Sequence, residues 1–223
     1  MSAGLYLLLP IKSLAAAKSR LLGAADGGAG RAAAHAELVV AVVRDTVAAA
    51  RTADAVTAVV AVTSDPVLTA VLAGAGVEVL ADRPEAGLNA ALRHGDAVLR
   101  DRTAVRRVGA LQADLPALRP AELDAALRAA GPRRAFCPDR QATGTTLLLA
   151  APGRPLDPRF GPGSAAAHTG SGAVPLLGPW ESVRCDVDTP DDLGAATALG
   201  LGPNTGALLR RAPVTSAEPP SAV

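Results

Sequence analysis

Short apolar runs of strand length alternate with longer amphipathic segments of helix length along most of this chain. The apolar runs predict strands at 5–11, 56–62, 77–80, 106–112, 133–137, 145–150 and 183–187. The amphipathic segments predict helices at 31–53, 66–74, 87–100, 120–130 and 190–200. Because most of the strand runs lack alternating polar residues, we expect both faces of the sheet to be covered. The pattern therefore predicts an α/β fold, a mostly parallel sheet flanked by helices.

The same pattern sets the expected domain boundaries. A chain of 223 residues with a hydrophobic fraction of 49% can build one sizeable core, so we expect a single domain over residues 1–202. Residues 203–223 show no periodicity, and we expect a mobile C-terminal tail there. Between 140 and 179 Gly and Pro interrupt the chain, and only one short helix, around 164–168, is feasible. A loop region of that length inside a domain is usually functional or disordered.

Composition excludes several classes of protein. The formal net charge of +1 gives no general attraction to nucleic acid or to an anionic membrane. The apolar stretches end well short of the ~20 residues that span a bilayer, and the N-terminus lacks the order of a signal peptide. We therefore expect a cytoplasmic protein without a nucleic-acid or membrane partner. Cys137 and Cys185 form no CxxC pair, so sulfur supplies neither a disulfide framework nor a zinc site.

Three cations follow the first predicted strand without an acidic neighbour. Lys12, Lys18 and Arg20 all lie in PIKSLAAAKSRL (10–21). Ligands of open parallel sheets bind beyond the carboxyl ends of the strands, where Arg and Lys can neutralise phosphate oxygens. The GxxxxGK[ST] motif is not present, so the stretch is not a P-loop. It indicates a polyphosphate ligand; the alternative is a solvated surface turn, which would normally carry acids among its bases.

Three carboxylates are expected near the same edge of the sheet. Asp114 follows the predicted strand at 106–112, and Leu-Pro after it ends that strand. Asp186 and Asp188 are two residues apart, so they point to one side if strand geometry persists. Hard oxygen ligands of this kind suit Mg²⁺, with phosphate and water completing the shell. The alternative is local: Asp188 caps the next helix and Asp114 makes a turn.

A glycine-containing loop region provides the third candidate element. TGTT (143–146) is followed by FGPGSAAAH (160–168), in which Gly161 allows a close backbone approach and Ser164 caps a short helix. This arrangement suits a second, smaller phosphate, although an ordinary glycine turn and N-cap would use the same residues. His168 lies within reach of this loop, but no histidine is assigned as a general base.

Six motifs together resemble one enzyme family in their order and spacing. They are LLLPIKSLAAAKSRL (7–21), GLNAALRHG (87–95), ADLPAL (113–118), TGTTLLLA (143–150), FGPGSAAAH (160–168) and CDVDTPDDL (185–193). The chain resembles the 2-phospho-L-lactate or phosphoenolpyruvate guanylyltransferases of coenzyme F-420 biosynthesis over about residues 5–200. The resemblance implies a Rossmann-like, nucleotide-diphospho-sugar transferase-like single domain. It also implies transfer of GMP from GTP to phosphoenolpyruvate.

The resemblance implies a role for each candidate residue. The nucleotide would be held by Pro10, Lys12, Lys18, Arg20 and Asn89. The phosphorylated acid would be held by Thr146, Gly161 and Ser164, and Mg²⁺ by Asp114, Asp186 and Asp188. Lys12, Lys18, Arg20 and Asp114 would serve catalysis, with GTP and phosphoenolpyruvate as the partners.

Several alternatives stay open from sequence. The acceptor is either phosphoenolpyruvate or 2-phospho-L-lactate, which differ by two hydrogens. Another nucleotidyltransferase, acting on a sugar phosphate or on molybdopterin, is a further possibility, as is a non-catalytic nucleotide-binding protein. The groups that read guanine, the number of metal ions and the oligomeric state are not determined by the sequence.

Overall fold

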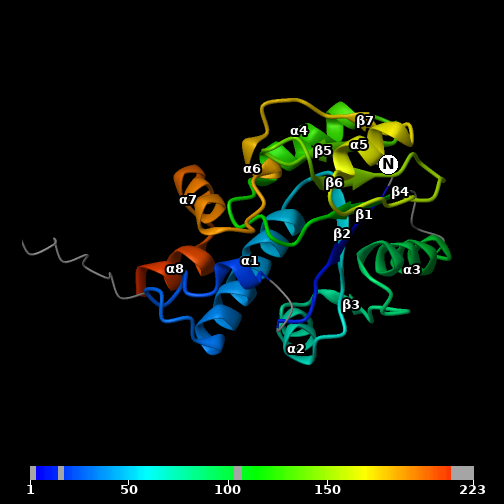
Figure 1. Ribbon diagram of the computed structural model, residues 1–223. Coiled ribbons are helices and arrows are strands. Elements are labelled where there is room, and N and C mark those ends of the chain that lie inside the picture. Colours follow the sequence, from blue (N-terminus) through cyan, green and yellow to red (C-terminus); the bar gives the residue numbers. More distant parts are fainter. Residues whose placement is uncertain (1–3, 15–17, 103–106, 212–223) are drawn as a thin grey trace, which may run out of the picture.

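The structure, a computed structural model, describes residues 4–14, 18–102 and 107–211. Its centre is a seven-stranded sheet in the order β3-β2-β1-β4-β6-β5-β7 (Figure 1). The strands are β1 (Leu5–Pro10), β2 (Val56–Val62), β3 (Glu78–Leu80), β4 (Arg107–Leu111), β5 (Ala135–Pro138), β6 (Thr145–Leu149) and β7 (Val174–Pro175). The predicted α/β fold class is confirmed.

The direction of strand β6 divides the sheet into two parts. Strands β1, β2, β3 and β4 are parallel to one another, whereas β6 runs antiparallel to both β4 and β5. Leu111, the last residue of β4, pairs with Leu147, so Thr145 at the start of β6 lies just beyond the carboxyl end of β4. The edge of the sheet where parallel strands end is therefore also the edge where β6 begins.

Helices cover both faces of the sheet. One face carries α1 (Ala32–Arg51), α2 (Pro66–Gly74), α4 (Pro120–Ala130) and α6 (Glu181–Arg184). The other carries α3 (Leu88–Arg100) and α5 (Ser164–Gly170). In β1, Leu7 and Leu9 pack in the first layer and Leu8 in the second, and all three are fully buried. Continuous apolar strands arise because alternate side chains enter different cores.

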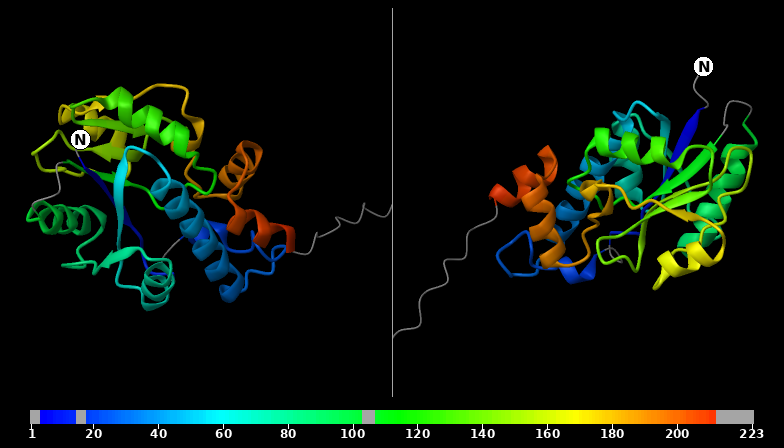
Figure 2. Two further views of the ribbon diagram at one scale, coloured as in Figure 1. Left: turned by 180° about the vertical axis from the view of Figure 1, so that it is seen from behind. Right: turned by 90° about the horizontal axis from the view of Figure 1, so that it is seen from above.

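Two helices near the C-terminus form a third cluster beside α1. They are α7 (Pro190–Leu199) and α8 (Pro203–Arg211), and they lie on the far side of α1 from the sheet (Figure 2). The prediction of a tail from residue 203 is wrong for residues 203–211, because these form α8. The carboxylate of Asp45 in α1 accepts hydrogen bonds from the backbone N–H groups of Asn204 and Thr205, at 3.0 and 2.8 Å. The rest of the expected tail, 212–223, lies outside the described residues.

One predicted strand is also wrong. Residues 183–187 do not join the sheet. Helix α6 ends at Arg184, and the chain then passes the turn after β4, where Val187 N–H donates to the Asp114 carbonyl. Val183 packs in the core shared with α4, whereas Cys185 and Val187 pack in the cluster of α7 and α8. The alternating apolar residues of 183–187 are thus buried in two separate cores. In the sequence this pattern looks like that of a strand, which is why a strand was predicted.

None of the helices in the described ranges is both long and apolar enough to cross a membrane.

Candidate active site

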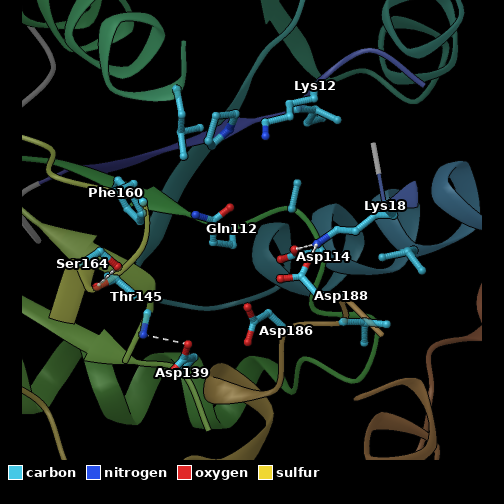
Figure 3. Close-up of a pocket in the computed structure, with 18 of the residues that line it drawn as sticks. Lys12, Lys18, Gln112, Asp114, Asp139, Thr145, Phe160, Ser164, Asp186 and Asp188 are labelled. Carbon is cyan, nitrogen blue, oxygen red and sulfur yellow. Dashed lines mark hydrogen bonds and ion pairs between the residues drawn. The ribbon is translucent and has the colours of Figure 1, made fainter. Parts of the chain in front are cut away.

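A cavity of about 550 Å³ opens at the sheet edge where β1 and β4 end and β6 begins. Its walls come from segments far apart in the sequence: the loop after β1, the turn after β4, the start of β6, the loop before α5, and residues 186–188. Figure 3 shows Lys18, Asp114 and Asp188 at one end and Thr145 and Ser164 at the other. We call these the carboxylate end and the hydroxyl end.

The carboxylate end is assembled around Asp114. β4 ends at Leu111, and Asp114 follows in the turn made by ADLP. Its backbone carbonyl accepts a hydrogen bond from Val187 N–H at 3.0 Å, which brings Asp186 and Asp188 to the same place. The Lys18 ammonium forms ion pairs with Asp114 and, at 2.5 Å, with Asp188. Lys18 is placed by a left-handed backbone conformation, with φ of 54°.

Crowded charges shift the pKa values of this cluster. Burial raises the pKa of Asp186 to about 8, and the charges of Asp114 and Asp188 act in the same direction. Burial lowers the pKa of Lys18, but the charges of Asp114 and Asp188 outweigh it and raise that pKa above its usual value. The cluster therefore has more negative charge than Lys18 alone offsets.

The residues of this end fit a divalent cation. Oδ1 of Asp114 is buried and has no hydrogen-bond partner in the described part of the chain. A buried carboxylate oxygen without a partner is costly unless a cation or donor meets it. As the side chains stand, no three His, Cys, Asp or Glu residues among those described surround a common metal position. The Lys18 ammonium lies between two of the carboxylates instead.

The hydroxyl end consists of two buried hydroxyl groups supported by a histidine. Ser164 Oγ and Thr145 Oγ1 are 3.1 Å apart, and Thr145 Oγ1 lies 2.9 Å from Nδ1 of His168. Burial and the nearby Arg134 guanidinium lower the pKa of His168 to about 4. His168 is therefore neutral at physiological pH.

A tight turn joins the two ends. The carboxylate of Asp139, directly after β5, accepts hydrogen bonds from the N–H groups of Thr143 and Gly144, at 2.9 and 2.8 Å. A Cβ at Gly144 would collide with that carboxylate, so the turn requires glycine. The turn places Thr143 and Thr145 on the cavity wall.

The structure brings most of the predicted site residues to this one cavity. Pro10, Lys12, Lys18, Arg20, Asp114, Gly161, Ser164, Asp186 and Asp188 all line it. Figure 3 shows Lys12 across the cavity from Asp139.

Two predicted residues are placed elsewhere. The Thr146 side chain is fully buried, and its hydroxyl donates to the Cys137 carbonyl at 3.4 Å, so Thr145 presents the hydroxyl at the cavity. Adjacent strand residues point to opposite faces, which explains the difference of one position. The Asn89 amide group binds the backbone of Phe160, as donor and acceptor, both at 2.8 Å. Asn89 thus holds the loop before α5, while its neighbour Leu88 lines the cavity.

Sequence reasoning missed several cavity residues, among them Gln112, Asp139, Thr145 and Phe160. Asp139 closely follows the predicted strand at 133–137, so the rule that ligands bind beyond the carboxyl ends of strands could have found it. A signal for Thr145 was present, because period-two alternation allows only one of two adjacent threonines to face the cavity.

The fold is one that solved nucleotidyltransferases share, and the cavity lies at the sheet edge where open α/β folds bind their ligands. Among solved structures, the chain is similar to a protein described as a nucleotide-diphospho-sugar transferase from Desulfovibrio desulfuricans G20. The TM-score is 0.65 and the identity 19%, over 94% of this chain and 95% of that one. It is also similar to a nucleotidyl transferase from Methanothermobacter thermautotroptrophicus, with a TM-score of 0.56 and 17% identity, over 88% and 97% of the two chains.

Sequence relatives identify the family more narrowly. The chain is 49% identical over 212 residues to a phosphoenolpyruvate guanylyltransferase of Salinispora arenicola, covering 94% of this chain and 95% of the relative. It is 53% identical over 207 residues to that of Streptomyces avermitilis, covering 92% and 94%. No family model matches the chain. At this identity and coverage, the chain belongs to the phosphoenolpyruvate guanylyltransferase family.

Proposed function

We propose that this protein transfers the GMP unit of GTP to phosphoenolpyruvate and releases pyrophosphate. A phosphate oxygen of phosphoenolpyruvate attacks the α-phosphorus of GTP, and the bond from that phosphorus to the bridging oxygen of the β-phosphate breaks. The observation that carries this proposal is the cavity itself, in which a carboxylate–lysine cluster faces a pair of hydroxyl groups. By the family resemblance, the product would serve coenzyme F-420 biosynthesis in the cytoplasm.

The reaction brings together two negatively charged reactants, so charge neutralisation and positioning are the main tasks of the protein. The phosphate of the acceptor is already anionic at neutral pH, and no general base is required. Lys12, Lys18 and Arg20 line the cavity near the end of β1, where they would bind the triphosphate. Arg20 offers a bidentate fork and the lysines offer point charges. Their positive charge stabilises the departing pyrophosphate.

Asp114, Asp186 and Asp188 would hold Mg²⁺ at the carboxylate end. The unpartnered Asp114 oxygen and the raised pKa of Asp186 both support a cation there. When bound, Mg²⁺ supplies neutralisation of the phosphate oxygens and helps to align the two reactants. Lys18, which pairs with Asp114 and Asp188 in this structure, would then be available to bind phosphate oxygens.

The hydroxyl end suits a compact anion. Thr145, Gly161 and Ser164 line that part of the cavity together with the small residues Gly144 and Gly163 and with Phe160. A sugar phosphate or molybdopterin would require space and polar groups for a large acceptor. Phosphoenolpyruvate and 2-phospho-L-lactate share the same charged groups, and the naming of the relatives favours phosphoenolpyruvate.

Product analysis tests the proposal directly. The purified protein is incubated with Mg²⁺, an equimolar mixture of GTP and ATP, and one candidate acid at a time. Mass spectrometry should detect the guanylylated phosphoenolpyruvate, with pyrophosphate released in equal amount. A dominant product from 2-phospho-L-lactate or a sugar phosphate would reassign the acceptor. Nucleotide binding without pyrophosphate release from any acid would show a non-catalytic binding protein.

A further inference from the structure

His168 is a buried histidine that lies behind the cavity wall, where it contacts the lining residues Thr145 and Phe160. It is fully buried, and its ring contacts those of Phe136 and Phe160 at centroid distances of 5.6 and 5.2 Å. Both of its ring nitrogens have partners. Nε2 lies 3.0 Å from the backbone nitrogen of Arg159, and Nδ1 lies 2.9 Å from Thr145 Oγ1.

These two contacts determine where the imidazole carries its proton. A backbone N–H can only donate, so Nε2 must accept from Arg159 and has no proton of its own. The neutral ring therefore carries its proton on Nδ1. It follows that Nδ1–H donates to Thr145 Oγ1.

The direction of that hydrogen bond determines whether the hydroxyl groups of Thr145 and Ser164 keep a proton that a ligand can accept. Thr145 and Ser164 have one proton each, and the contact between them at 3.1 Å uses one of the two. Within the described ranges, neither hydroxyl has a further acceptor. Both residues line the cavity, so the second proton is available to a ligand there. With the opposite tautomer, Thr145 would donate to His168 and Ser164 to Thr145, which would use both protons internally.

We propose that His168 is a positioning residue that orients the Thr145–Ser164 pair as a hydrogen-bond donor to an anionic oxygen of the phosphorylated acid. The proposal rests on the proposed function, because it assigns the hydroxyl end to the acceptor. It assigns His168 no contact with either reactant.

Two substitutions at this position separate its two hydrogen bonds. His168→Asn can place an N–H near the position of Nδ1, whereas His168→Gln can accept from Arg159 but leaves no donor beside Thr145. We expect His168→Gln to raise KM for phosphoenolpyruvate by about tenfold or more, as expected for a lost hydrogen bond to a charged group, and to leave KM for GTP unchanged. His168→Asn should restore most of the loss. His94→Gln, on α3, is the matched control with wild-type constants.

A double-mutant comparison tests whether His168 acts through Thr145. Thr145→Val removes the hydroxyl at nearly constant volume, and Thr145→Ser keeps it. If the proposal holds, adding His168→Gln to Thr145→Val raises KM for phosphoenolpyruvate no further. Additive effects in the double variant would overturn it, as would equal changes in KM for GTP and for the acid.

The tautomer can be measured without any activity. Nitrogen NMR of the protein labelled with ¹⁵N-histidine, at pH 7, should show one ring protonated on Nδ1 only, and the signal should vanish in His168→Asn. An Nε2-protonated or doubly protonated His168 ring would refute the inference even in an active enzyme. Failure of the proposed function looks different: the Nδ1-protonated ring is present, but no acid yields a guanylylated product.

Discussion

Asp114 is the residue on which the carboxylate end depends. One of its oxygens pairs with Lys18, and the other is buried without a hydrogen-bond partner among the described residues. Its backbone carbonyl also holds residue 187 in place. The same residue therefore supplies charge to the site and anchors the chain that carries the other two carboxylates.

We expect Asp114→Asn to impair catalysis while leaving the fold intact. The substitution keeps the backbone bond to Val187 but removes a charge that a cation needs. By comparison with other preorganised electrostatic contacts, the loss of transition-state stabilisation should be roughly 3 kcal/mol or more. The measurement is kcat/KM for both substrates at saturating Mg²⁺, with exposed Asp54→Asn as the control. Turnover close to that of the wild type would remove Asp114 from the mechanism.

At the scale of elements, sequence patterns located most of the helices and strands. The predicted bounds of α2 and α4 agree with the structure, because Pro at the first turn marks the start of each helix. Both cores could be expected from strands that lack polar alternation. The patterns could not show that β6 is reversed, because the direction of a strand depends on its partners in the sheet. Thr146 was assigned to the cavity by family resemblance, and the alternation of side chains along β6 places Thr145 there instead.

Helix α8 was missed because its stability comes from tertiary contacts. Its first residues are held by the buried carboxylate of Asp45, which belongs to α1 and lies 159 residues away from Asn204. Such a distant cap leaves no local signal in the sequence.

Removing the Asp45 carboxylate should therefore destabilise α8. Asp45→Ala leaves the N–H groups of Asn204 and Thr205 without an acceptor, and we expect a loss of about 1–2 kcal/mol in the free energy of unfolding. Urea denaturation measures the loss, and hydrogen exchange should show faster exchange in 203–211 than in the sheet. Asp54→Ala serves as the exposed control. Unchanged stability and unchanged exchange would show that α8 is held by its apolar contacts alone.

At the scale of the whole molecule, the carboxylate end of the cavity destabilises the folded state when no cation offsets its negative charge. The pKa of Asp186 is raised to about 8 by burial and by its neighbouring carboxylates, whereas an unfolded Asp titrates near 4. The folded state therefore retains a proton on Asp186 that the unfolded state has lost. Its stabilising contribution is complete below about pH 4 and decreases as the pH rises through about 8.

We expect the melting temperature of the chelated wild-type protein to fall between pH 6 and pH 8.5 more steeply than that of Asp186→Asn. The variant has no proton to lose at this position. Addition of Mg²⁺ should raise the wild-type melting temperature most at the upper end of this range, where Asp186 is ionised. Scanning calorimetry with and without chelator measures both effects. Parallel pH profiles for the two proteins would contradict the assignment of the raised pKa.

The reversed strand β6 has a consequence for how this enzyme can be altered. In the proposed function, GTP is met by the chain as it leaves the sheet after β1 and β4, and the acid by the chain around the start of β6. The contacts proposed for the acid therefore lie within one stretch, about 139–168, apart from those proposed for the nucleotide at 10–21 and 114. Replacing this stretch with that of a homologue should change which small acid the enzyme accepts. Its preference for the nucleoside triphosphate should stay the same.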